Sequence, residues 1–180
     1  MVKTSNMKVP QYRELVGIHI ASLRHLAQGN DAQNRLEGIG LQWPREIGAF
    51  AGNDPLVAWR SPTEKLLLSS KAEPLKLALT ELAPGKYDAL VATGLSEALS
   101  VHEVSGPHID EWMAHLVDAL AIPTRSGTCT RARMADVAVF LIRLEPEKLW
   151  LLSDSTIRPY IQNWLEFSFN GASPNTPISK

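Results

Sequence analysis

Two stretches of the chain, residues 61–74 (SPTEKLLLSSKAEP) and residues 145–159 (EPEKLWLLSDSTIRP), carry the same signals in the same order. Each begins with a proline-containing turn, continues with Glu-Lys and an apolar run, and ends with serine, a short polar link and a second proline. Pro62, at the second position of SPTE, fits a type I turn, and the apolar stretch LVAWR precedes it. These features predict an antiparallel hairpin followed by a helix, and they predict it twice.

The residues around the first hairpin complete a larger unit. Residues 17–25 place Ile18 and Ile20 at alternate positions, which is typical of a half-buried strand. Residues 30–41 have the capping and apolar residues of a short helix. After the hairpin, three leucines lie at helical spacing, at positions 75, 79 and 82. The predicted order is therefore strand, helix, strand, strand, helix.

The second half of the chain repeats this order. Residues 98–104 alternate like a strand, and residues 105–120 predict an amphipathic helix with Ser105 as its N-cap. Two strands joined by the EPEK turn and a final helix follow, at residues 135–144, 149–154 and 158–167. The unit recurs at a spacing of about 80 residues. The alternative is that two hairpin-then-helix units, which are common in proteins, resemble each other by chance.

Neither half has enough strands to form a stable sheet alone. We therefore predict one α+β domain over residues 13–169, in which pseudo-repeats at residues 17–85 and 95–169 share a mainly antiparallel sheet covered by helices. The two ends, residues 1–12 and 170–180, are rich in Ser, Asn, Pro and Gly, and we predict that both are disordered.

Composition narrows the class of protein. With 44% hydrophobic and 21% charged residues, the chain is typical of a globular domain. A net charge of −1 and the lack of any block of like charges argue against a nucleic-acid partner. No run approaches the roughly twenty apolar residues of a membrane span, so we expect no membrane partner. The single cysteine and the polar first ten residues favour a cytoplasmic location.

The only cysteine, Cys129, lies in the basic segment RSGTCTRAR. Neighbouring arginines favour a thiolate and hence a nucleophile. No base accompanies it nearby in the sequence, because all five histidines are distant from it: His19, His25, His102, His108 and His115. A buried structural thiol is the more common state of a single cysteine, and it is the state that we expect here.

Three arginines of the same segment, Arg125, Arg131 and Arg133, form a candidate binding surface. Arg131 and Arg133 are two residues apart, so on an extended chain they project from the same face as Cys129. Guanidinium groups pair well with carboxylates and phosphates, which favours an anion site or contact with an acidic patch of another subunit. Two solvated arginines are the alternative. No glycine-rich phosphate loop is present, and we predict a subunit interface.

Neither the histidines nor the carboxylates indicate a catalytic site. His108 and His115 are seven residues apart, about 10 Å along a helix, which is too far for direct ligation of one metal ion. The apolar neighbours of Asp136 predict that it is buried in an ion pair with Arg133 or Arg143. We therefore expect no catalytic, cofactor-binding or metal-binding residue in this chain.

Four segments together carry a family resemblance: LVAWRSPTEKLLL, LSEALSVHEVSGPHIDEWMAHLVD, TRARMADVAVFLIRLEPEKLWLLSD and YIQNWLEF. In this order they resemble the gamma subunit of heterotetrameric sarcosine oxidase. In looser form they are similar to the folate-binding T-protein of the glycine cleavage system. The resemblance covers residues 17–167 and rests on the order of elements, with no catalytic signature.

The resemblance implies a noncatalytic subunit of a complex that oxidatively demethylates sarcosine or a related secondary amine. It implies larger flavoprotein partners of the alpha and beta type and a small zinc subunit of the delta type. FAD, FMN, NAD, tetrahydrofolate and zinc are then expected on these partners, and no cofactor on this chain. The alternative is a stand-alone tetrahydrofolate-binding or aminomethyl-transfer domain.

Overall fold

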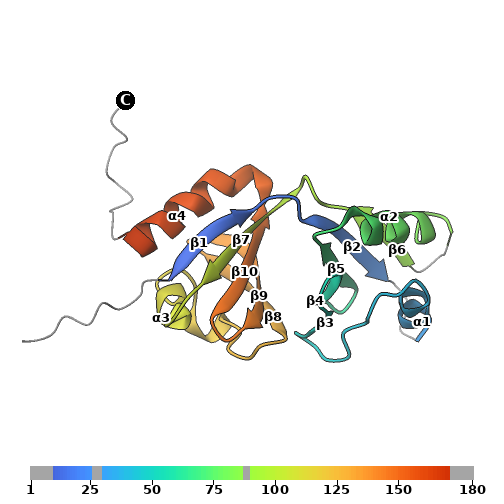
Figure 1. Cartoon of the computed structure of the whole chain (residues 1–180), viewed down its shortest axis with the longest axis horizontal. Helices are drawn as coiled ribbons and strands as arrows, with labels where there is room; N and C mark the ends of the chain where they lie inside the picture. The colour runs from blue at the N-terminus through green and yellow to red at the C-terminus, as the bar shows by residue number, and fades with distance from the viewer. Residues whose placement is uncertain (1–9, 26–29, 87–89, 171–180) are drawn as a thin grey trace, which may run out of the picture.

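A computed structural model of the chain describes residues 10–25, 30–86 and 90–170. Its strands form two five-stranded antiparallel sheets that lie side by side (Figure 1). Sheet A contains, in spatial order, β1 (Gln11–Leu15), β7 (Leu99–Ser105), β10 (Lys148–Asp154), β9 (Val137–Glu145) and β8 (Thr128–Met134). Sheet B contains β3 (Phe50–Gly52), β4 (Leu56–Ser61), β5 (Glu64–Ser69), β2 (His19–His25) and β6 (Leu90–Gly94).

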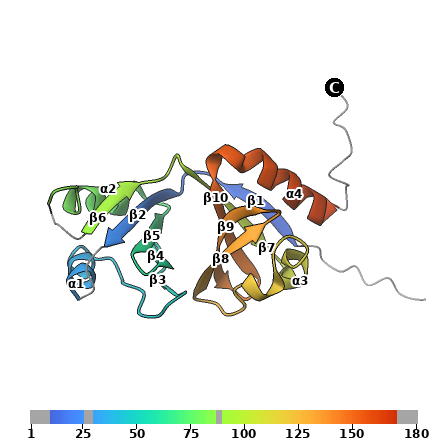
Figure 2. The same ribbon diagram turned by 180° about the vertical axis from the view of Figure 1, so that it is seen from behind.

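The helices lie on the outer sides of the two sheets, and both views show the sheets facing each other in the middle (Figures 1 and 2). Sheet B is flanked by α1 (Asn30–Gly38) and α2 (Ala72–Glu81). Sheet A is flanked by α3 (Ile109–Met113) and α4 (Arg158–Asn170). Two short 3₁₀ turns complete the described elements, η1 (Ala119–Ala121) and η2 (Ser155–Ile157). Among the described residues, no helix has the length and apolarity to cross a membrane.

The two sheets repeat one topology. The order β3-β4-β5-β2-β6 in sheet B corresponds strand for strand to β8-β9-β10-β7-β1 in sheet A. The last strand of each order is exchanged between the halves: β1 precedes β2 in the chain but pairs with β7, while β6 precedes β7 but pairs with β2. The predicted α+β class and the repeated unit are confirmed.

The predicted single sheet differs from the structure, which has two sheets. Each hairpin pairs with the first strand of its own half, so each half builds its own sheet. The sheets meet at one edge, through an isolated antiparallel bridge between Ala49 and Thr128 and a hydrogen bond from the Cys129 amide to the Gly48 carbonyl. The two exchanged strands connect them again elsewhere.

Both predicted hairpins are present, each with a two-residue turn that begins with proline. Ser61 pairs with Glu64 across Pro62, and Glu145 pairs with Lys148 across Pro146. A proline at this position fixes φ near the value that the turn requires. This local chemistry explains why the same motif forms the same hairpin twice.

Strand alternation divides the core into three layers. In β5, Leu66 and Leu68 face the other sheet, while Leu67 faces the helices. In β9, Phe140 and Ile142 face the other sheet, while Leu141 faces α4. Both strands are thus buried on two faces, which explains their nearly continuous apolar sequence. Full burial of such a side chain contributes about 1.5–3 kcal/mol.

The helix predicted over residues 105–120 is wrong in length, because α3 spans only five residues. Ser105 ends β7, and Gly106 follows with φ of 129°, a conformation outside the helical region. A Cβ at Gly106 would lie 2.9 Å from the Cα of Pro10, so this close approach requires glycine. His108 has φ of 58°, and the helix begins only after it.

The predicted chain ends also differ from the structure. β1 begins at Gln11, inside the segment 1–12 that was predicted to be disordered. It is ordered because it pairs with β7 over its whole length. At the other end, α4 continues to Asn170. Residues 1–9 and 171–180 lie outside the described residues.

Candidate functional site

A buried carboxylate, Glu64, lies at the start of β5 on the face that is turned toward sheet A. Its side chain is 9% exposed. Its Oε1 accepts a hydrogen bond of 2.6 Å from the Ser22 hydroxyl and one of 3.1 Å from Nη1 of Arg60. Glu64 occupies the same strand face as Leu66 and Leu68, because these positions alternate. A charged group thus terminates an otherwise apolar row.

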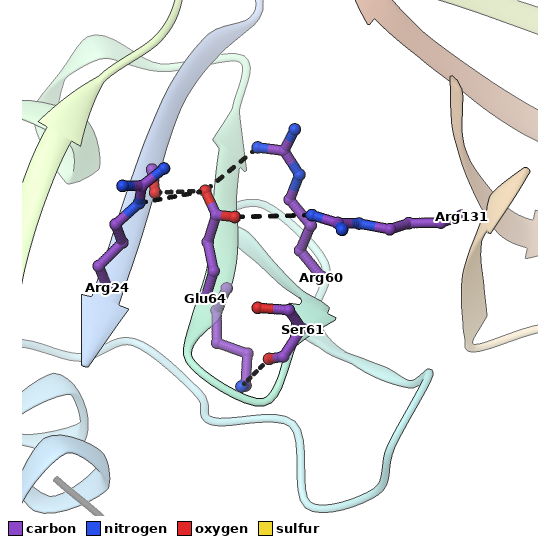
Figure 3. Close-up of polar contacts among 7 residues, drawn as sticks. Arg24, Arg60, Ser61, Glu64 and Arg131 are labelled. Carbon is purple, nitrogen blue, oxygen red and sulfur yellow. Dashed lines mark hydrogen bonds and ion pairs between the residues drawn. The ribbon is translucent and has the colours of Figure 1, made fainter. Parts of the chain in front are cut away.

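Three arginines from three strands surround Glu64 (Figure 3). Arg60 of β4 approaches to 3.1 Å, while Arg24 of β2 and Arg131 of β8 stand at 3.8 Å. Three positive charges against one negative charge give this group, called here the Glu64 cluster, a net charge of +2. Arg131 reaches Glu64 from the opposite sheet, so the cluster joins sheets A and B.

The three arginines predicted to form one surface have different contacts. Arg131 contacts Glu64. Arg125 lies 3.6 Å from Glu46, and both side chains are exposed. Arg133 donates to the backbone carbonyl of Asp136 in the turn between β8 and β9. Their predicted role at a subunit interface stays a prediction.

The prediction for Asp136 is wrong. Asp136 is exposed, with φ of 71°, and it follows Ala135, whose φ is 44°. These two left-handed residues form the turn between β8 and β9, so the strand begins one residue later than Asp136.

Arg143, the other expected partner of Asp136, is fully buried and forms an ion pair with Asp110. It also donates to the carbonyl oxygens of Pro123 and Pro146, at 2.7 and 3.0 Å. Three of its donors therefore have acceptors, as a buried guanidinium requires. Arg143 connects β9 to α3 and to two loops, which is a structural role.

Cys129 is buried between the two sheets, with 4% of its surface exposed. Its Sγ lies 3.4 Å from the carbonyl oxygen of Ala49 and 3.3 Å from that of Trp59. Burial raises the pKa of this thiol to about 12. The thiol therefore stays protonated at neutral pH, which is the state of a structural cysteine.

Lys65, next to Glu64, is a buried cation that the sequence pattern did not indicate. It is 2% exposed, and its Nζ lies over the rings of Trp43 and Trp59, 5.0 and 5.5 Å from their centroids. Nζ also donates to the Ser61 carbonyl at 3.0 Å. Burial lowers the pKa of Lys65 to about 8. The two aromatic faces partly replace the lost hydration of the ammonium group.

The only signal in the sequence that could indicate Glu64 and Lys65 as buried charged residues is their place at the start of an apolar strand. They are the first two residues of a strand whose next three residues are leucines, so one of them must face each side of the sheet. Arg24 and Arg60 carry no comparable signal, because only pairing of β2, β4 and β5 brings them to Glu64.

A cavity of about 340 Å³ lies between the two sheets beside the Glu64 cluster. Arg60 and Arg131 line it, and Ser153 and Asp154 line it from β10. The rest of the lining is apolar: Leu66, Leu99, Ala132, Ala138, Val139, Phe140 and Leu152. Within residues 10–25, 30–86 and 90–170, no group of three His, Cys, Asp or Glu side chains could hold a metal ion.

His102 is a second buried polar group, on the helix side of β7. It is fully buried, and neither ring nitrogen has a hydrogen-bond partner among the described residues. Burial lowers the pKa of this imidazole, so it is neutral at pH 7. It faces Glu14 across the pairing of β1 with β7, and Glu14 is itself paired with Arg158. His102 does not contact the Cys129 sulfur, whose neighbours are carbonyl groups.

The fold, two antiparallel sheets with helices outside, is shared with solved structures. The chain is similar to a chain of heterotetrameric sarcosine oxidase from Corynebacterium sp. U-96, solved in complex with pyrrole 2-carboxylate. The TM-score is 0.80 at 19% sequence identity, covering 94% of this chain and 89% of that chain. No family model matches the sequence, and a search of curated proteins finds no match.

A second similar structure is the glycine cleavage system aminomethyltransferase T from Bartonella henselae. The TM-score is 0.57 at 10% identity, and the match covers 89% of this chain but 46% of that chain. This chain therefore spans about half the length of the aminomethyltransferase. At these identities, both comparisons establish the fold.

Proposed function

We propose that this chain is a noncatalytic assembly subunit, of the gamma type, in a heterotetrameric flavin-dependent enzyme related to sarcosine oxidase. The complex would oxidatively demethylate sarcosine or a related secondary amine in the cytoplasm. The observation that carries the proposal is the similarity to a sarcosine oxidase chain along nearly the whole length of both chains. A match of this extent is what a subunit with the same place in a complex requires.

The partners in this proposal are larger flavoprotein subunits of the alpha and beta type and a small zinc subunit of the delta type. FAD, FMN, NAD, tetrahydrofolate and zinc belong to these partners. Arg125, Arg131 and Arg133 are proposed at the contact surface, because their side chains are exposed and cationic. The buried, protonated thiol of Cys129 supports a chain without nucleophilic chemistry of its own.

A stand-alone tetrahydrofolate-binding or aminomethyl-transfer domain is the second candidate. The similarity to the aminomethyltransferase favours it. However, this chain covers only 46% of that protein, so much of the aminomethyltransferase has no counterpart here. The first proposal is therefore the stronger one.

The test is a pull-down of the tagged chain from its native host, with absorbance measured in the flavin bands. We expect larger flavoproteins to copurify and the isolated chain to be colourless. A double variant, Arg131→Ala with Arg133→Ala, is expected to recover less flavin while the isolated chain keeps its circular dichroism spectrum. Recovery of a monomer without flavin would overturn the proposal, and saturable tetrahydrofolate binding by that monomer would support the second candidate.

A further inference from the structure

The Glu64 cluster holds cationic groups that Glu64 does not satisfy. Arg24 and Arg131 stand 3.8 Å from the nearest Glu64 oxygen, beyond hydrogen-bond distance. In the described part of the chain, neither guanidinium donates a hydrogen bond to another residue. Each guanidinium carries five N–H donors in a fixed fork. Both can thus bind a further acceptor without losing a hydrogen bond, and of the two Arg131 lines the adjacent cavity.

The charges of the cluster favour an anion as that acceptor. The net charge is +2, and the Arg24 and Arg131 side chains are 67% and 60% exposed, so both can be reached from solvent. Arg60 is 27% exposed and is held by its hydrogen bond to Glu64. Glu64 therefore orients a guanidinium that lines the adjacent cavity together with Arg131.

The cavity adds a second chemical requirement, since the surface beyond the arginines is apolar. Leu66, Val139, Phe140 and Leu152 form much of its wall, and they come from both sheets. A strongly hydrated inorganic anion gains nothing from such a wall, whereas a hydrocarbon chain or ring gains by burial. A volume of about 340 Å³ lies at the small end of the range for ligand pockets.

Asp154 determines which part of the cavity the acidic group of a ligand can occupy. It lines the cavity on β10, and its Oδ1 accepts hydrogen bonds from the Thr156 amide and hydroxyl at 2.8 and 2.7 Å. These hydrogen bonds lower the pKa of Asp154, so it is ionised at neutral pH. Its negative charge repels an anion, so the acidic end of a ligand must lie at Arg60 and Arg131.

We infer that the cavity between the two sheets binds a carboxylate carried on a small apolar body, with the carboxylate at Arg60 and Arg131. The carboxylate belongs either to a free organic acid or to an acidic residue beside an apolar side chain in another protein. Both sources present the same chemistry to the site. The inference concerns the isolated chain and holds whether or not the chain is an enzyme subunit.

The test is a titration of the full ¹⁵N-labelled chain, observing the arginine Nε–H signals and backbone amides by NMR. The probes are 4-phenylbutyrate, its uncharged analogue 4-phenylbutanol, and inorganic phosphate at matched ionic strength. We expect 4-phenylbutyrate to shift the signals of Arg60, Arg131 and Phe140 saturably, with no saturable shift from the other two probes. Equal shifts with phosphate, or none with 4-phenylbutyrate, would overturn the inference.

Variants and peptides complete the test. Arg131→Gln is expected to weaken 4-phenylbutyrate binding at least tenfold, whereas Arg133→Gln, on the same strand and outside the cavity, leaves it unchanged. Equal weakening by both variants would overturn the inference.

The blocked peptides acetyl-Phe-Glu-amide and acetyl-Phe-Gln-amide test whether the carboxylate comes from a protein or from a free acid. Tighter binding of the Glu peptide than of 4-phenylbutyrate assigns the carboxylate to a protein, and the reverse order assigns it to a free acid.

Discussion

The dipeptide Glu-Lys occurs in both hairpins, but its two copies lie one position apart relative to the turn. Glu64 is the first residue of β5, whereas Glu147 is the second turn residue and Lys148 is the first residue of β10. Glu64 and Lys65 are buried, at 7% and 2% exposure. Glu147 is exposed, and the partly exposed Lys148 pairs with Glu145 in the same turn. The hairpins themselves are alike, with proline in a two-residue turn. Local sequence therefore determines the hairpin, while a shift of one position relative to the turn separates the buried copy of Glu-Lys from the exposed one.

The first hairpin also lies beside the contact between the sheets. β4 packs against β8, and the segment before β3 bridges to the start of β8. This contact brings Arg131 to Glu64 and Cys129 to the carbonyl group of Trp59. In the second hairpin, the Glu147 carbonyl accepts a hydrogen bond from Gly106, but its side chain stays in solvent. Glu64 therefore has a structural role, whereas Glu147 is a surface residue of its turn.

The largest expected difference between the copies comes from Glu64→Gln and Glu147→Gln. Loss of the Glu64 charge leaves three guanidinium groups without their shared counterion, and we expect a cost of about 2–3 kcal/mol in the free energy of unfolding. Glu147→Gln should change that free energy by less than about 0.5 kcal/mol, because its side chain is exposed. Urea unfolding of both variants at neutral pH measures the difference.

Equal effects of these two substitutions would contradict the contrast between the copies. Glu64→Leu is a useful companion variant, since it removes the hydrogen-bond acceptor as well as the charge. It should be more destabilising than Glu64→Gln, because the Ser22 hydroxyl then loses its acceptor.

A smaller difference is expected from Lys65→Met and Lys148→Met, and it depends on pH. The pKa of Lys65 falls from 10.5 to about 8 on burial, so between pH 8 and 9 the unfolded chain holds more protons than the folded chain. The free energy of unfolding should therefore rise by about 1 kcal/mol over this interval in the wild type. Lys65→Met should abolish the rise, as measured by urea unfolding at each pH.

Lys148→Met is the control for the same interval. Its hydrogen bond to Glu145 raises the pKa of Lys148, so the folded and unfolded chains both keep this proton below pH 9. The rise should survive in this variant. The comparison stops at pH 9 because of Cys129, whose pKa rises from 9.0 to about 12 on burial. Above pH 9 the thiol ionises in the unfolded chain but not in the folded chain, so its contribution lowers the free energy of unfolding as the pH rises. A wild-type curve that is flat from pH 8 to 9 would contradict a buried Lys65.

The repeated hairpins could be predicted from the sequence because their causes are local. Proline turns, alternation and the apolar character of residues 66–68 act within a few residues of one another. The failures have nonlocal causes. The helix expected from Ser105 begins only at Ile109, because Ser105 is still paired with Gln11 and Lys148, both distant in the chain. β1 forms through its pairing with β7, which is distant in the chain.

In the Glu64 cluster, too, features with local causes could be predicted and features with nonlocal causes could not. The spacing of Cys129 and Arg131 predicted a common face, and both do turn toward sheet B. The partner of Arg131 could not be predicted, because Glu64 lies on a different sheet. The apolar neighbours of Asp136 predict a buried strand residue, although the left-handed backbone of Ala135 and Asp136 forms a turn. The periodicity of a strand predicts which face of the sheet a residue lies on, but it does not predict which element packs against that face.

The smallest effect is expected for the pair that joins the two halves, Arg131 and Glu64. A double-mutant cycle with Arg131→Gln and Glu64→Gln should give a coupling energy of about 0.5 kcal/mol, because Arg131 is 60% exposed and 3.8 Å from the carboxylate. Added NaCl should reduce the coupling, since solvent screens an exposed charge. Arg133→Gln with Glu64→Gln is the control cycle, with no coupling expected. A salt-insensitive coupling above about 2 kcal/mol would mean that this ion pair holds the two sheets together. A small coupling means that the apolar layer between the sheets holds them together, and that Arg131 stays available to bind another anion.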